Sequence, residues 1–202
     1  MRFTIGLVSA FVLVGSSAQA APTGAEARMV ATVDAEQART LRLEDIPEDI
    51  RAWARQCVLD YIACTLAGAK DELTEILLAE MQEAGGKGTA TIMGHGIKLP
   101  PAAAAVVNGA ASHALDYDDV NLAMPGHPTV AILPALLALA EEIDASGADL
   151  VDAYIVGVEV QECLAEAVNM VHYARGWHTS LTLGAPSAAA ACARLLRLDS
   201  GQ

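Results

Sequence analysis

The chain has 202 residues, with 12 Lys or Arg against 25 Asp or Glu, and therefore carries a formal net charge of −13. A chain of this length fits one domain or a large piece of one, and its acidic balance excludes a basic groove for nucleic-acid phosphates. The hydrophobic fraction of 53% excludes a disordered chain, and 41 alanines against 8 aromatic residues exclude an all-β fold. We therefore expect an all-α protein that does not bind nucleic acid.

The first 20 residues form a segment of a different kind. Arg2 precedes an apolar run over 3–15, and the segment ends in Ala18-Gln19-Ala20. This order is typical of a secretory signal peptide, and 13 apolar residues are too few to span a bilayer, which takes about 20. We expect removal of residues 1–20, leaving a mature domain over 21–202 without a membrane span. The protein would then be periplasmic or secreted, and cytoplasmic if the segment is not a signal peptide.

Apolar residues at helical spacing predict a series of helices along the mature chain. Their expected ranges are 25–40, 46–68, 71–84, 101–115, 129–144, 149–169 and 179–198. Gly68 is expected to stop the second of these helices just past its end. The apolar stripe of the same helix, which includes Trp53 and Leu66, is expected to be buried. Pro134 is expected to kink its helix or to mark a short turn before it.

Residues 85–101 differ from the helical segments because they combine glycines with β-branched residues. This composition predicts one short β-hairpin or an irregular turn. The stretch lacks the GxxxxGK[ST] pattern of a phosphate-binding loop. The four cysteines also include no C-x-x-C pair, which argues against a zinc ribbon or a thioredoxin-type site. We expect these cysteines to be small buried residues: Cys57, Cys64, Cys163 and Cys192.

Two connections between predicted helices contain the residues suited to chemistry. The first covers 112–119 and is followed by His127-Pro128, and the second covers 173–179. His127 and His178 each precede a predicted helix, whose outward N–H groups favour anions. Together with Asp116, the two histidines form a set that can move a proton at a substrate carbon.

Other interpretations of these residues stay open. Each histidine could be a helix cap or a hydrogen-bonded structural residue, as we expect for His95, His113 and His172. The first connection also contains nitrogen and oxygen ligands that suit a divalent metal: His113, Asp116, Asp118, Asp119 and His127. Their spacing matches neither a calcium loop nor an H-E-x-x-H zinc helix, and the lack of G-x-S-x-G disfavours a serine hydrolase. We therefore do not expect a bound metal.

Several stretches carry a resemblance to a known family. They are I-P-E-D-I with L-D-Y-I-A-C-T-L-A-G (46–68), A-A-V-V-N-G-A-A-S-H-A-L-D-Y-D-D (104–119), G-H-P-T-V-A-I-L-P-A-L-L-A-L-A-E (126–141), A-Y-I-V-G-V-E-V-Q (153–161) and G-W-H-T-S-L-T-L-G-A-P-S-A-A-A-A-C-A-R-L-L (176–196). In this order they resemble the N-terminal, helical part of the MmgE/PrpD family, which includes 2-methylcitrate dehydratase and cis-aconitate decarboxylase. Any one stretch alone would be a weak signal, and their shared order is specific.

The resemblance implies a large helical domain joined to a smaller lid domain, with the active site between them and commonly a homodimer. It also implies lyase chemistry, dehydration or decarboxylation, on small citrate-like di- or tricarboxylates without a metal or cofactor. Asp116, His127 and His178 match active-site positions of the family, which implies roles in proton transfer and substrate binding. Arg175 and Thr179, close to His178, are expected to bind the substrate.

The chain departs from the family pattern in two respects. The threonine that follows the family's acidic motif is Val120 here, which removes one expected substrate contact. The family's active-site lysine and lid would follow Gln202, so we expect a partial helical domain that is inactive alone and pairs with a second copy or with a lid segment. Arg175 and Lys98 are the nearby cations that remain. The alternative is a non-catalytic helical scaffold or interaction domain that retains the family's fold.

Overall fold

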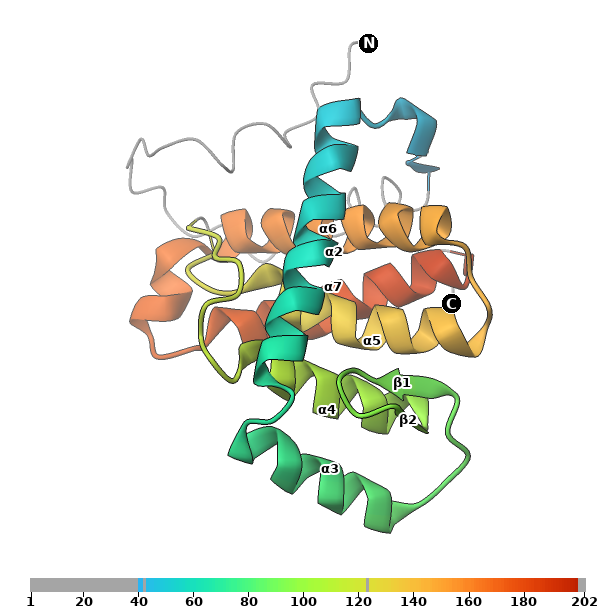
Figure 1. Ribbon diagram of the computed structural model, residues 1–202. Coiled ribbons are helices and arrows are strands. Elements are labelled where there is room, and N and C mark those ends of the chain that lie inside the picture. Colours follow the sequence, from blue (N-terminus) through green and yellow to red (C-terminus); the bar gives the residue numbers. More distant parts are fainter. Residues whose placement is uncertain (1–39, 42, 123, 200–202) are drawn as a thin grey trace.

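The computed structural model describes residues 40–41, 43–122 and 124–199. The described chain is helical apart from one hairpin (Figure 1). In chain order its elements are η2 (Leu43–Asp45), α2 (Glu48–Gly68), α3 (Glu72–Ala84), β1 (Ala90–Ile92), β2 (Ile97–Leu99), α4 (Pro101–His113), α5 (Pro128–Glu142), α6 (Gly147–Ala174) and α7 (Thr179–Leu195). The all-α prediction is confirmed. The predicted signal peptide, and the predicted helix over 25–40 apart from its last residue, lie outside the described residues.

The hairpin occurs within the range that the glycine-rich composition predicted. β1 and β2 pair in antiparallel fashion, with Ala90 opposite Leu99. Glu141 on α5 anchors the hairpin: its carboxylate accepts hydrogen bonds from the N–H and the hydroxyl of Thr91 and forms an ion pair with Lys98 Nζ at 2.8 Å. The ammonium group of Lys98 therefore has Glu141 as its ionic partner, rather than an anionic ligand.

Helix α5 is the central helix of the fold. It packs against α4, α6 and α7, and its residues Ile132, Leu133 and Leu136 are 0% exposed. Apolar residues cover nearly every side of α5, so only a position enclosed by other helices removes them from water. Helix α2 crosses this layer and adds Tyr61 to the same core (Figure 1). None of the described helices is long and apolar enough to cross a bilayer.

Several local features differ from the sequence predictions. Trp53 and Leu66 are 54% and 52% exposed rather than buried. The buried stripe of α2 is narrower than predicted and consists of Ala54, Tyr61, Cys64, Thr65 and Gly68. Pro134 lies inside α5 and does not mark a turn before the helix, which was one of the two alternatives predicted for it. Helix α6 extends to Ala174, so the first residues of the second predicted connection are helical.

Gly68 has a packing role rather than the predicted role of a stop residue. It is the last helical residue of α2, and Ala69 after it has a right-handed helical conformation. A Cβ atom on Gly68 would lie only 2.0 Å from the carbonyl oxygen of Ala111 on α4. The absence of a side chain therefore permits the close approach of α2 and α4.

We expect Gly68→Ala to lower the free energy of unfolding by about 1–3 kcal/mol, the range observed for overpacked sites. The matched control is Gly147→Ala at the start of α6, where an added Cβ meets no atom within 4 Å. Thermal unfolding of the 202-residue chain, followed by circular dichroism, should show a lower Tm for Gly68→Ala only. Equal Tm values for the two variants would contradict the close approach of α2 and α4.

Candidate active site

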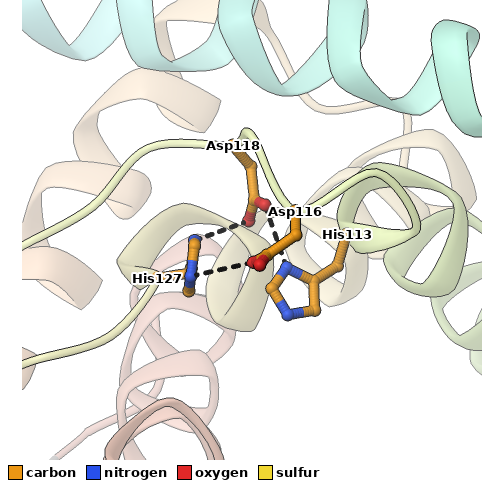
Figure 2. Close-up of side chains that lie close together, drawn as sticks. All are labelled: His113, Asp116, Asp118 and His127. Atoms are coloured by element: carbon orange, nitrogen blue, oxygen red, sulfur yellow. Dashed lines mark hydrogen bonds and ion pairs between the residues drawn. The ribbon is translucent and has the colours of Figure 1, made fainter.

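A cluster of four side chains lies at the loop between α4 and α5 (Figure 2). His113 is the last residue of α4, and His127 directly precedes α5. Asp116 and Asp118 belong to the loop between these helices. One nitrogen or carboxylate oxygen from each residue lies within 4.8 Å of those of the others. These four residues are called the His–Asp cluster below.

Asp118 is the buried member of the His–Asp cluster, with a side chain that is 3% exposed. Its Oδ1 lies 2.9 Å from His113 Nδ1, at hydrogen-bond distance, and its Oδ2 lies 3.3 Å from His127 Nδ1. The two imidazole rings meet edge to face, with centroids 4.7 Å apart. A buried carboxylate is costly unless nearby groups stabilise its charge. In the described chain, the ionic partners of Asp118 are these two imidazoles.

Asp116 lies on the open side of the cluster. Its side chain is 78% exposed, and its Oδ1 lies 3.5 Å from His127 Nε2. His127 therefore stands between a buried carboxylate on its Nδ1 side and an exposed carboxylate on its Nε2 side (Figure 2). The backbone of Asp116 has a φ of +54°, in the left-handed region. Asp tolerates this conformation better than most residues do, and such outliers concentrate at functional sites.

The loop is held in place by polar contacts with α5 and α6. Thr129 on α5 donates both its N–H and its hydroxyl to Asp119, and the same hydroxyl lies 2.5 Å from the hydroxyl of Tyr154 on α6. Burial raises the pKa of Asp119, while the hydrogen bonds from Thr129 oppose that change. Asp119, which the sequence placed among the ligands of the alternative metal site, therefore lies outside the His–Asp cluster.

A second anchor joins the loop to α6. Asn121 and Gly126 pair through their backbones, with N···O distances of 2.9 and 3.2 Å. The side-chain amide of Asn121 donates a hydrogen bond to Glu162 Oε1. Burial, together with repulsion from Glu166 and Glu159 on the same helix, raises the pKa of Glu162 to about 7. The carboxyl group of Glu162 in this anchor therefore gains or loses its charge near neutral pH.

The N-terminus of α7 lies against the same loop. The N–H of His127 donates to Ser180 Oγ at 2.8 Å, and the hydroxyl of Thr179 donates to the carbonyl oxygen of Pro125 at 2.6 Å. A Cβ on Gly126 would lie 2.6 Å from Ser180 Oγ, so a glycine before His127 permits this approach. The N-termini of α5 and α7 are therefore neighbours.

The turn before α7 contains the remaining candidate residues. His178 precedes α7 as its N-cap residue and is exposed, as is Arg175. His172 on α6 holds this turn, because its Nε2 lies 2.7 Å from Thr182 Oγ1 and its ring stacks on Trp177. His178 and Arg175 are outside the His–Asp cluster, on the connection that adjoins it.

The sequence located the cluster but not all of its members. It singled out Asp116 and His127, which the structure brings together. His113 was expected to be a helix cap or a hydrogen-bonded structural residue, with a metal ligand as the alternative, and Asp118 was considered only as a metal ligand. The available signal was their five-residue spacing, which a turn after a helix can close. Thr179, expected to bind substrate, has a buried side chain whose hydroxyl is used by Pro125.

Two imidazoles and two carboxylates are also a donor set that binds divalent metals. Each of the two ring nitrogens of His127 lies beside a different carboxylate. This arrangement also suits a proton that enters or leaves through the ring of His127.

Comparisons with known proteins match the chain to the model of the MmgE/PrpD N-terminal domain over residues 35–202. The cis-aconitate decarboxylase-like protein oryM of Aspergillus oryzae is 34% identical over 167 residues, which cover 79% of this chain and 35% of the relative. The cis-aconitate decarboxylase of Aspergillus terreus is 33% identical over 169 residues (80% and 34%). The human cis-aconitate decarboxylase is 30% identical over 172 residues (79% and 34%). The chain thus spans about a third of the length of these curated relatives.

We expect Glu162→Gln to stabilise the protein at pH 8. A carboxyl with a raised pKa contributes stability below its ordinary pKa of 4.5, and this contribution is lost as the pH rises through about 7. The variant should therefore gain on the order of 1 kcal/mol at pH 8, or a few degrees in Tm, and little at pH 4.5. The control is Glu142→Gln, at an exposed glutamate that ends α5. Equal Tm values for parent and Glu162→Gln at pH 8, measured by circular dichroism, would contradict the buried charge.

Proposed function

The chain belongs to the MmgE/PrpD family, and we propose that it supplies the acid–base part of a lyase site for a small di- or tricarboxylate. The reaction is a dehydration or decarboxylation of a citrate-like acid, in keeping with the similarity to cis-aconitate decarboxylases. The observation that carries this proposal is the position of His127, whose ring lies between buried Asp118 and exposed Asp116.

His127 and Asp116 are the proposed proton-transfer groups. A lyase of this class moves a proton to or from a substrate carbon, and a positioned side chain accelerates such a step by about 10²- to 10⁴-fold. The 78% exposure of the Asp116 side chain leaves it accessible to a ligand. The His127 side chain is 18% exposed and has a carboxylate beside each of its ring nitrogens.

Substrate carboxylates are proposed to bind beside His178 and Arg175. Helix α7 begins at Thr179, and the side chain of its N-cap residue His178 makes no hydrogen bond to the first turn. The N–H groups of a helix N-terminus attract anions, and Arg175 adds a full positive charge in the same exposed turn. Because the N-terminus of α5 adjoins that of α7, a carboxylate bound here would lie next to the proton-transfer groups.

Turnover is proposed to need more than this domain. The chain spans about a third of the length of its curated relatives, and the family resemblance assigns a lysine and a lid to the rest of the relatives' length. A di- or trianion requires further cations in a strongly acidic protein, and exclusion of water strengthens every charge interaction in the site. We also propose pairing with a second copy or with a lid segment.

The 202-residue chain alone should convert cis-aconitate or 2-methylcitrate slowly or not at all, because loss of one electrostatic contact to a transition state costs about 100-fold or more. Fusion to the remaining segment of the Aspergillus terreus relative should restore turnover. In that fusion, His127→Ala and His178→Ala should each lower kcat by about 10² or more.

The matched control is His95→Ala, since His95 bonds the carbonyl oxygen of Ala69 near the hairpin. Its kcat should equal that of the parent fusion. Full-rate turnover by the 202-residue chain, or unchanged kcat in both of the other histidine variants, would overturn the proposal. Folded fusions that bind neither acid would instead favour a non-catalytic scaffold.

A further inference from the structure

The carboxylate of Asp118 faces the Nδ1 atoms of two histidine rings. Its Oδ1 lies 2.9 Å from Nδ1 of His113, and its Oδ2 lies 3.3 Å from Nδ1 of His127. The second contact is an ion-pair distance and not a hydrogen bond, and both of its atoms are buried without a hydrogen-bond partner in the described chain. The dashed lines in Figure 2 show both rings directed at this one carboxylate.

From this geometry we infer that Asp118 is a positioning residue that holds the proton of both His113 and His127 on Nδ1, and that His113 is a second imidazole of the active site. A carboxylate can only accept hydrogen bonds. Each neutral imidazole carries one N–H, and the nitrogen that carries it is set by the partner of the ring. With its proton on Nδ1, His113 donates a hydrogen bond to Asp118, and His127 places an N–H beside the buried Oδ2 of the same carboxylate. Each Nε2 is then left as a proton acceptor.

The Nε2 atoms of the two rings face away from Asp118, toward the open side of the cluster. His127 Nε2 lies next to exposed Asp116, and the second nitrogen of His113 points away from Asp118 (Figure 2). The His113 side chain is 41% exposed, so a ligand can reach it. The role of His113 in turnover rests on the proposed function, whereas the tautomer assignment does not.

The neighbouring carboxylate provides an internal contrast. Asp119 is one residue further along, yet it accepts hydrogen bonds from the N–H and hydroxyl of Thr129 on α5. Loss of its charge removes a negative group near the rings without removing an acceptor from them. Asp119→Asn is therefore the matched control for Asp118→Asn.

The test is nitrogen NMR of the 202-residue chain labelled with ¹⁵N-histidine, at a pH where the rings are neutral. Single His→Gln variants assign the signals. In the parent chain, both His113 and His127 should carry the proton on Nδ1. In Asp118→Asn, the amide oxygen can accept from one ring while the amide NH₂ faces the other, so at least one ring should change to Nε2–H. Asp119→Asn should leave both rings unchanged, and so should the signals of His172, which contacts Thr182 instead.

Nε2–H as the main form of either ring in the parent chain would overturn the inference. This result does not depend on whether Asp118→Asn folds. Unchanged tautomers in folded Asp118→Asn would overturn it as well.

Activity of the fusion enzyme provides a separate readout. Asp118→Asn should lower kcat by about 100-fold or more, as misplacement of a proton on a catalytic imidazole does in hydrolases. KM should change by about threefold or less, because the buried side chain of Asp118 does not touch substrate. His113→Gln should lower kcat in the same direction. Unchanged kcat in both variants would overturn the active-site role of His113 and Asp118. If instead the tautomers are as expected but His127→Ala retains full kcat, the proposed function fails while the tautomer assignment stands.

Discussion

The carboxylate of Asp118 is a negative charge removed from water, and the two histidines that face it lie at the end of α4 and the start of α5. The loop between these helices must therefore bring His113 and His127 to the same point. Any path that failed to do so would leave a buried charge without a partner, which is among the costliest defects in a folded protein. The left-handed backbone at Asp116 is the local cost of this path. The same path places the Asp116 side chain on the open side of His127.

The helices make this arrangement rigid. Helix α5 carries His127 at its N-terminus and is enclosed by α4, α6 and α7. Close contacts at residues without side chains bring the neighbours within reach: Gly68 at the crossing of α2 and α4, and Gly126 beside the first turn of α7. The two histidines of the cluster stand at the ends of packed helices, which hold side chains more precisely than free loops do.

The electrostatics of the domain set limits on what it can bind unaided. The sequence has 25 acidic residues against 12 basic ones, and the loop that forms the site is anchored on an acidic stretch of α6 around Glu162. Lys98 is paired with Glu141 on the hairpin. Attraction for the anionic substrate proposed above would therefore rest on the adjoining helix N-termini, Arg175 and the imidazoles, together with whatever a longer family member or a partner adds.

The sequence alone determined the helical class, the approximate helix ranges, the hairpin and the family, because alanine content, apolar periodicity, glycine-rich turns and ordered motifs are local features of the chain. It also pointed to Asp116 and His127. It could not determine that Asp118 faces inward to two histidines while Asp119 faces α5, that His113 joins the cluster, or that Trp53 is exposed. Adjacent residues of one loop point in different directions according to backbone angles such as the φ of +54° at Asp116. Those angles are set by contacts with helices distant in the sequence, and only the tertiary structure decides them.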